Sequence, residues 1–386
     1  MKRRLLPVAV AAAALTMAGA LTPALSGAST SAPVSVTVTH TPTPPKGAND
    51  EYRCTWFDPH FTESQMVTKS VFAADPKTKA SVARELHHAI AYIAAPNVVA
   101  QIKALDPTGK KGWSCFSSPL GATSMTGLSA LPWLYGWSPG HGADSEPDGY
   151  GVSVPAGSLI VLQVHYNSLA GKSPVTATFS TWSEAQATST RTPLYPRQYV
   201  AAPDLPCVAP YNNVKKYPLC DHAASLNDLA KRFGASAKSF TQLIEGFCNR
   251  GQFPTSSSAS NATSATCSYR VPDTVTIHSV WPHMHLLGKT FNLVVCHQDP
   301  TCAPANTQTL TVVGSYNFDL QVGYPINPPV VVTPGDYVKV TCTYDPHLRK
   351  LNPQTKNLAP RYVTWGDGSS DEMCLGTLIY SNGANT

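Results

Sequence analysis

The chain has 386 residues, of which 13% are charged and 34 are prolines. Its formal net charge of +5 is small for this length and gives no reason to expect a nucleic-acid partner. The length allows two domains, and the low charge with many prolines favours a loop-rich globular protein built from strands.

The first residues are typical of a cleaved signal peptide. A basic start at residues 2–4 precedes an alanine-rich apolar run, Leu5 to Leu21, and small residues near Ala28 suit cleavage after residue 28. Removal would leave a net charge of about +2. A retained anchor is the alternative, but the run is only about 17 residues and no similar stretch follows. We therefore expect a secreted, extracytoplasmic protein without a stable membrane span, and the alanine-rich signal indicates a bacterial source.

Residues 29–50 are rich in Ser, Thr and Pro, apart from an alternating Val-Ser-Val-Thr-Val, and predict a flexible lead-in. From residue 51 onward, short apolar runs separated by Gly, Pro and Asn favour antiparallel β-sandwiches. The runs are Leu159–Tyr166, Val175–Trp182, Thr274–Trp281, Phe291–Cys296, Val330–Val332 and Tyr337–Tyr344.

A proline-rich segment at residues 190–206 indicates a connection between two units. We expect an N-terminal domain over 51–200 and a C-terminal domain over 201–386. Between residues 221 and 246, apolar residues recur at helical spacing and predict two short helices within a cysteine-bracketed insert, about 207–267. Residues 254–266, rich in Ser, Thr and Asn, predict a surface loop.

All ten cysteines lie after the signal peptide, and an even number in an exported protein favours five disulfides. The absence of any CxxC pair weakens a zinc-ribbon interpretation. Sequence alone does not fix the connectivity, but sequential pairing is the simplest choice. It joins Cys54 to Cys115, Cys207 to Cys220, Cys248 to Cys267, Cys296 to Cys302 and Cys342 to Cys374.

An adjacent pair, His87 and His88, stands within a segment whose apolar residues fit either a helix or one face of a strand. On a regular strand the two imidazoles would point apart, so binding of one metal ion by both requires a bent backbone. Taken alone, two partly buried, hydrogen-bonded histidines are the simpler interpretation.

Two later segments place further histidines on strands. Gln163 and His165 share one face of the run around them. His283 and His285 are two residues apart, so a strand brings both imidazoles to one side, within reach of one metal ion. Met284 lies on the opposite face and is expected in the core.

Near the C-terminus, a polar loop leads through Met373 into an apolar run that begins at Cys374. The thioether of Met373 could serve in packing only. Two imidazoles with one thioether nevertheless form a ligand set suited to copper, because soft sulfur stabilises the reduced ion.

Together with residues 52–54, these segments, in this order, resemble the copper type II, ascorbate-dependent monooxygenase family, which includes peptidylglycine alpha-hydroxylating monooxygenase and dopamine beta-monooxygenase. The resemblance runs from about residue 50 to residue 380, and its most specific stretches are 162–166, 283–289 and 369–374.

The resemblance implies an all-β fold of two tandem antiparallel jelly-roll domains with a small helical insertion, facing each other across a solvent-filled cleft. Each domain would hold one of two copper ions per chain. His87, His88 and His165 would hold the ion that stores and passes an electron. His283, His285 and Met373 would hold the ion at which dioxygen reacts with a substrate C–H bond. Gln163 and Tyr52 fall on positions that support the first site and the cleft.

The departures concern the substrate. Trp281 stands where peptide-amidating members of the family carry an arginine that anchors a carboxylate, and Leu375 and Thr377 replace an asparagine and a tyrosine. Peptidylglycine hydroxylation is therefore doubtful, and the 207–267 insert has no counterpart.

The leading hypothesis is a copper monooxygenase that hydroxylates a small organic substrate with dioxygen and ascorbate, or another one-electron donor. A copper-binding or electron-transfer protein without hydroxylase activity is the alternative, and a purely structural double sandwich is a third. The sequence does not indicate an oligomeric state.

Overall fold

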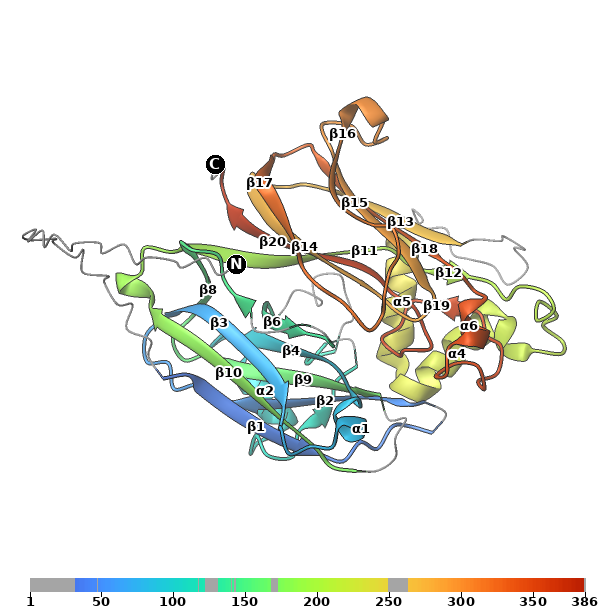
Figure 1. Ribbon diagram of the computed structural model, residues 1–386, viewed down its shortest axis with the longest axis horizontal. Helices are drawn as coiled ribbons and strands as arrows, with labels where there is room; N and C mark the ends of the chain where they lie inside the picture. Colours follow the sequence, from blue (N-terminus) through green and yellow to red (C-terminus); the bar gives the residue numbers. More distant parts are fainter. Residues whose placement is uncertain are drawn as a thin grey trace, which may run out of the picture. The chain divides into compact units, whose positions relative to one another are not determined.

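The computed structural model describes residues 32–384 apart from 47, 117, 122–130, 140, 142–143, 168–172 and 249–262 (Figure 1). The predicted signal peptide and most of the predicted loop at 254–266 lie outside these residues. Strands dominate the described part of the chain, in agreement with the expected all-β class. Among the described residues, no helix combines the length and apolarity needed to cross a membrane.

The largest sheet has nine strands, in the order β1-β10-β3-β8-β11-β20-β14-β17, with β7 beside β3. Its strands are β1 (Val34–His40), β3 (Gln65–Ala74), β7 (Asp144–Ser145), β8 (Tyr150–Val154), β10 (Val175–Ala185), β11 (Thr192–Val200), β14 (Val275–Met284), β17 (Tyr324–Val332) and β20 (Cys374–Asn382).

Smaller sheets complete the strand content. A five-stranded sheet, order β5-β2-β9-β4-β6, contains β2 (Asp50–Phe57), β4 (Leu86–Ala94), β5 (Trp113–Ser114), β6 (Trp133–Trp137) and β9 (Leu159–Asn167). A four-stranded sheet, order β13-β18-β15-β16, contains β13 (Ser264–Arg270), β15 (Gly288–Cys296), β16 (Thr307–Val313) and β18 (Tyr337–Tyr344). The short strands β12 (Asp204–Leu205) and β19 (Val363–Thr364) pair with each other.

The two predicted helices of the insert are present. They are α4 (His222–Phe233), capped by the Asp221 carboxylate on the N–H of Ala224, and α5 (Ala235–Cys248). The remaining helical segments are short: α1 (Ala80–Ala83), α2 (Val99–Leu105), α6 (Leu348–Leu351) and the 3-10 turns η1 (Gln186–Thr188), η2 (Pro218–Cys220) and η3 (Pro304–Asn306).

The proline-rich segment expected to connect two units contains β11, a strand of the nine-stranded sheet. β11 pairs in parallel with β8 and antiparallel with β20, so one sheet runs through residues on both sides of the predicted boundary. The prolines are tolerated because the segment is extended, which suits their fixed φ. Division into two domains at residue 200 stays a prediction.

The expectation of a flexible lead-in is wrong for residues 34–40. They form β1, which pairs with β10 along its whole length, and its side chains alternate between half-buried and exposed. The Val-Ser-Val-Thr-Val alternation, with the period of a strand, was the decisive signal rather than the Ser and Pro content. Residues 264–266, expected in a loop, likewise belong to β13.

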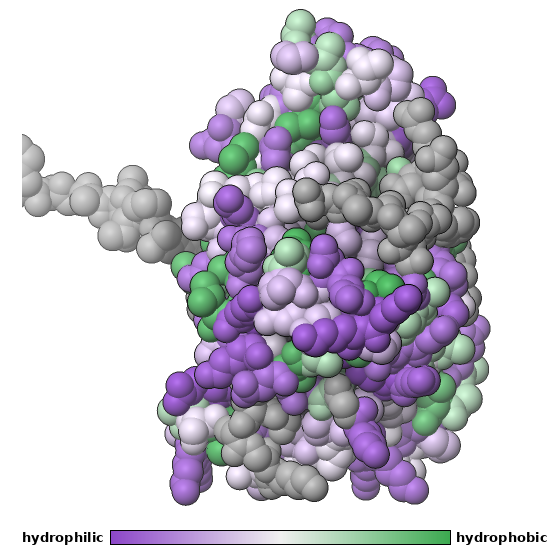
Figure 2. Space-filling view, turned by 90° about the vertical axis from the view of Figure 1, so that its right-hand side faces the viewer, coloured by the Kyte–Doolittle hydropathy of each residue, from purple (hydrophilic) through white to green (hydrophobic). Residues whose placement is uncertain are grey.

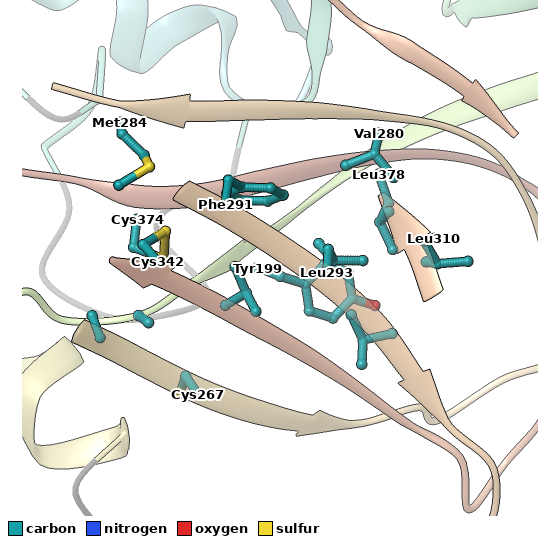
Figure 3. Close-up of a cluster of buried hydrophobic side chains, with 14 of the residues drawn as sticks. Tyr199, Cys267, Val280, Met284, Phe291, Leu293, Leu310, Cys342, Cys374 and Leu378 are labelled. Atoms are coloured by element: carbon teal, nitrogen blue, oxygen red, sulfur yellow. A yellow bond between two sulfur atoms is a disulfide. The ribbon is translucent and has the colours of Figure 1, made fainter. Parts of the chain in front are cut away.

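All five sequential disulfides are confirmed. Five disulfides are typical of proteins outside the reducing cytoplasm. One of them, Cys342–Cys374, joins β18 of the four-stranded sheet to β20 of the large sheet. Figure 3 shows it with Met284 and Phe291 in one buried cluster, which confirms that Met284 faces the core.

A buried ion pair joins the helices α4 and α5. His222 Nε2 lies 3.0 Å from Glu245 Oε1, and both side chains are buried. Burial alone would lower the pKa of His222, but the hydrogen bond and charge of Glu245 raise that pKa above its usual value.

Replacing Glu245 by Gln should therefore destabilise the protein in a pH-dependent way. Because the folded pKa of His222 exceeds its unfolded value, the stabilisation is complete below the unfolded pKa of about 6.5 and is lost as pH rises through the folded pKa. We expect the free energy of unfolding of wild type to exceed that of Glu245→Gln by about 2 kcal/mol near pH 6, and by less near pH 9. Urea unfolding of both metal-free proteins measures this difference in free energy. A difference that grows with pH would contradict the raised pKa of His222 in the ion pair with Glu245.

Candidate metal centre

A bulge in β4 brings the adjacent histidines to one side. In the pairing of β4 with β9, Leu86 lies opposite Tyr166 and His88 lies opposite His165, with a register shift between the two pairs. His87 is therefore the extra residue that interrupts strand alternation. The strand interpretation is correct, and the bend that shared metal binding requires is present.

The three Nδ1 atoms of His87, His88 and His165 converge. They lie 3.0 Å apart between His87 and His165, 3.2 Å between His165 and His88, and 3.4 Å between His87 and His88. Imidazole nitrogens bound to one ion at about 2.0 Å stand roughly 3.3 Å apart in a tetrahedral arrangement. The cluster thus fits a single metal ion held by three nitrogen ligands.

Asp50 fixes the orientation of the third imidazole. His165 Nε2 donates to Asp50 Oδ1 at 2.9 Å, which leaves the lone pair on Nδ1 facing the cluster. Burial alone would raise the pKa of Asp50, but hydrogen bonds from His165 and Ser369 hold that pKa below its usual value. Sequence reasoning missed Asp50, which is 115 residues from its partner.

The two residues predicted to support this site lie in different positions. The ring of Tyr52 stacks on that of His165, with centroids 4.2 Å apart, and its hydroxyl donates to the carbonyl oxygen of Asp367. Gln163 donates to the carbonyl oxygen of Cys115 at 2.7 Å and accepts from Tyr92. Tyr52 therefore contacts a candidate ligand, whereas Gln163 lines the neighbouring cavity.

The second pair of histidines has its Nδ1 atoms engaged and its Nε2 atoms left for a ligand role. His283 Nδ1 donates to Gln321 Oε1 at 2.6 Å, and His285 Nδ1 donates to the carbonyl oxygen of Asp371 at 3.2 Å. The ring centroids lie 5.1 Å apart. His285 Nε2 is buried and has no hydrogen-bond partner. A metal ion between the two Nε2 atoms would supply the missing interaction.

Strand register brings Met373 next to these histidines. In the pairing of β14 with β20, Met284 lies opposite Cys374 and His283 lies opposite Leu375. Met373, the residue before Cys374, is therefore on the neighbouring strand next to the end of the histidine segment. Met373 and His283 line the same cavity. The backbone register thus places Met373 beside the histidine segment, at the ends of two paired strands.

The carboxylate of Glu372 ties this loop to the histidine segment. It accepts backbone N–H groups from His285 at 3.0 Å, Leu287 at 2.6 Å and Met373 at 3.2 Å. Burial raises the pKa of Glu372 to about 8 although these donors oppose the shift. These three hydrogen bonds hold the histidine segment and the methionine loop in position relative to each other.

The two ligand sets face each other at short range. The ring centroids of His88 and His283 lie 6.0 Å apart, and the ring of Phe318 stacks on His87 at 4.3 Å and lies 6.1 Å from His285. This differs from the wide solvent-filled cleft that the resemblance implied, because Phe318 fills space between the sets. Burial lowers the pKa values of His87, His88, His283 and His285, which favours the neutral imidazoles that metals bind.

A largely apolar cavity opens between the two sets. His88, His283 and Met373 contribute to its wall. The other lining residues are mainly aromatic, aliphatic or amide side chains: Ala89, Ile90, Tyr92, Trp133, Gly136, Trp137, Ser138, Gln163, Gln198, Val200, Phe240, Trp281, Gln321, Trp365, Asp367, Leu375 and Thr377. None of these described lining residues is Lys or Arg.

Comparison with known families gives a match over the C-terminal part of the chain. Residues 247–386 match the family described as copper type II ascorbate-dependent monooxygenase, C-terminal domain. The match includes His283, His285 and Met373 but not the first ligand set. No curated protein matches the chain.

Solved structures give no further guidance. A fucolectin from striped bass (Morone saxatilis) serum is 9% identical with a TM-score of 0.20, covering 91% of this chain and 97% of its own. A peptide-N(4)-(N-acetyl-beta-D-glucosaminyl) asparagine amidase is 8% identical with a TM-score of 0.27, covering 91% of this chain and 98% of its own. TM-scores this low support no inference about fold or function.

Replacing Asp50 by Asn should weaken metal binding at the first site alone. The Asn amide has only one acceptor oxygen, and its N–H groups would face side chains that now donate to Asp50, such as His165 and Ser369. His165 would therefore lose its fixed orientation. We expect copper affinity at this site to fall about 10- to 100-fold, measured by competition with a chelator. Asp299→Asn, which removes an exposed carboxylate in the β15–β16 connection, is the control. Equal affinities in all three proteins would contradict the role of Asp50.

Proposed function

We propose that this chain, whose residues 247–386 match the C-terminal domain of the copper type II ascorbate-dependent monooxygenases, binds two copper ions and hydroxylates a C–H bond of a small, uncharged organic substrate. Dioxygen and an external one-electron reductant, such as ascorbate, are the co-substrates. The observation that carries the proposal is the pair of oriented, buried imidazole sets that meet at one apolar cavity.

The donor atoms support different roles for the two ligand sets. Three nitrogens from His87, His88 and His165 form a set suited to electron storage. His283, His285 and Met373 form a set that includes a thioether, which favours the reduced state of copper. Three protein ligands would leave one coordination position open for dioxygen. Bound copper would supply the one-electron chemistry and the activation of dioxygen. Monooxygenation places one oxygen atom in the product and one in water, consuming two electrons and two protons for each turnover.

The chain's own residues orient the ligands and exclude water. Gln321 and the carbonyl oxygen of Asp371 each accept an Nδ1–H, which directs both Nε2 atoms toward the second ion. Phe318 covers His87 and approaches His285, so bulk water has little access between the sets. A dry site limits unproductive release of reduced oxygen.

The cavity wall supports an uncharged substrate with an aromatic or aliphatic body. Trp281 forms part of the wall, and its ring stacks on His141 with centroids 5.1 Å apart. Because no Lys or Arg is among the described lining residues, a substrate carboxylate would be buried without a cation, which is unfavourable. Gln198 and Thr377 supply neutral hydrogen-bonding groups instead.

An electron-transfer protein with the same ligands is the second candidate. Such a protein does not need a largely apolar cavity beside the second ligand set, so the cavity favours an enzyme.

A matched pair of methionine variants separates a ligand from a core residue. Met373→Leu removes the candidate thioether ligand, whereas Met284→Leu removes a thioether buried in the core. We expect about two copper ions in wild type, with ascorbate-driven oxygen uptake stimulated by 2-phenylethanol, a small uncharged aromatic probe. Met373→Leu should lose about 100-fold or more of this uptake, and Met284→Leu should retain it.

Two copper ions without stimulated uptake by any neutral probe would favour the electron-transfer alternative. Absence of copper from the purified protein would contradict both functions. Equal losses in the two methionine variants would contradict the role of Met373.

The packing of Trp281 on Gly136 allows a test of the cavity. A Cβ atom added at Gly136 would lie 2.3 Å from Trp281 Cζ3, so Gly136→Ala should displace the indole. Gly314→Ala is the control, because nothing lies within 4 Å of a Cβ atom there. We expect the KM for 2-phenylethanol to rise about 10-fold in Gly136→Ala with unchanged copper content. 3-Phenylpropanoate should be a poor substrate of wild type, and efficient turnover of this carboxylate would contradict the proposed substrate class.

A further inference from the structure

A second pocket, away from the candidate metal centre, is rich in positive charge. We call it the arginine pocket. Its described lining contains three cationic side chains, Arg349, Lys350 and Arg361, and no Asp or Glu. Apolar residues and prolines form most of the remaining wall: Leu205, Pro206, Cys207, Val208, Ala209, Tyr211, Leu287, Pro346, His347, Pro360 and Val363.

The two guanidinium groups have donors without acceptors. Arg361 is only 7% exposed; its Nη1 lies 2.9 Å from Asp228 Oδ2, but its Nε has no hydrogen-bond partner. Arg349 donates through Nη2 to the carbonyl oxygen of Ala359 at 3.0 Å, but its Nη1 is buried without a partner. Buried donors of this kind are rare in folded proteins and indicate an acceptor that binds there.

Neighbouring carboxylates do not neutralise the pocket, because they are already shared. Arg232 binds both oxygens of Asp371, at 2.8 and 3.0 Å. Asp228 Oδ2 lies 2.9 Å from Arg232 Nε and 2.9 Å from Arg361 Nη1. Three guanidinium groups, with Arg349, therefore face two carboxylates. Burial, together with the charges of Arg361 and Arg232, lowers the pKa of Arg349 to about 10, although the charge of Asp371 opposes the shift.

We propose that the arginine pocket binds a small oxyanion, a carboxylate, phosphate or sulfate, whose oxygens accept from Arg349 and Arg361. Planar guanidinium groups match the spacing of such oxygens and form strong charge-assisted hydrogen bonds with them. Lys350 is exposed and adds a mobile ammonium group at the rim. Among the described residues, no acceptor lies within hydrogen-bond distance of Arg349 Nη1 or Arg361 Nε.

The position of the pocket gives the anion a structural consequence. It lies between the 205–211 segment before α4 and the turn that carries α6, and so joins the helical insert to the C-terminal strands. Figure 2 views the side on which α4 and α6 lie in Figure 1, and hydrophilic side chains predominate on this face. The same charge network reaches Asp371, whose carbonyl oxygen accepts from His285. The inserted segment, which contributes Phe240 to the substrate cavity, thereby also forms one wall of an anion site.

Calorimetric titration of the full-length, metal-free protein tests the proposal. Sulfate, phosphate and acetate are titrated separately at constant ionic strength. We expect at least one of them to bind with a Kd of about 1 mM or tighter, and the order of the three identifies the preferred oxyanion. Arg349→Gln, which removes a partly exposed arginine, should weaken binding about 10-fold or more. Arg270→Gln is the control, since it removes one positive charge from an exposed position on β13.

Arg361→Gln should have the same effect as Arg349→Gln, and circular dichroism shows whether that buried variant is folded. If it is not, Arg349→Gln and Lys350→Gln carry the test. No binding to wild type by any of the three anions would overturn the proposal. Equal weakening in Arg349→Gln and Arg270→Gln would also overturn it, because it would indicate attraction to net charge alone. Copper content and oxygen uptake do not enter these outcomes, so the anion site stands or falls independently of the proposed oxidation.

Discussion

The antiparallel pairing of β14 with β20 is the constraint on which the candidate metal centre depends. Its register sets Met284 opposite Cys374, so the histidine segment and the methionine loop end at the same edge of the sheet. The disulfide from Cys374 to Cys342 fixes β20 against the opposing sheet, and Glu372 binds three N–H groups around the same point. A slip of one residue in this register would turn His283 into the core and Met284 outward.

β11 extends this constraint to strands of the N-terminal half. It pairs with β20 on one side and with β8 on the other, so the strands on both sides of residue 200 belong to one continuous sheet. This connection limits how far the halves can separate, and it agrees with the 6.0 Å between the rings of His88 and His283. Electron exchange between ions bound at the two sets would then need only a short path. Within the C-terminal half, the helical insert is tied to the methionine loop, because Arg232 of α4 binds Asp371.

Local sequence patterns predicted what depends on strand period and chain proximity. The alternation of His283, Met284 and His285 correctly separated the core methionine from the histidines. Sequential pairing of the cysteines, chosen as the simplest connectivity, is correct for all five disulfides. The environment of His87 and His88 was ambiguous because a bulge has no periodic signal; it is defined only by the partner strand. Asp50 and Gln321 were not predictable, since each meets its histidine through tertiary contacts 115 and 38 residues apart in sequence.

The hydrogen bonds around the histidines explain why these costly arrangements are held in place. Neutral imidazoles with converging lone pairs repel one another, and buried nitrogens without partners are unfavourable. Rotation of a ring would relieve both costs unless its other nitrogen were engaged. Asp50, Gln321 and the carbonyl oxygen of Asp371 engage that nitrogen in His165, His283 and His285 respectively. Each acceptor thus stabilises the one tautomer that leaves a lone pair for a metal ion, so the fold retains ligand geometry at the expense of alternative hydrogen bonds. The geometry of the candidate metal centre therefore depends as much on these three acceptors as on the histidines that they orient.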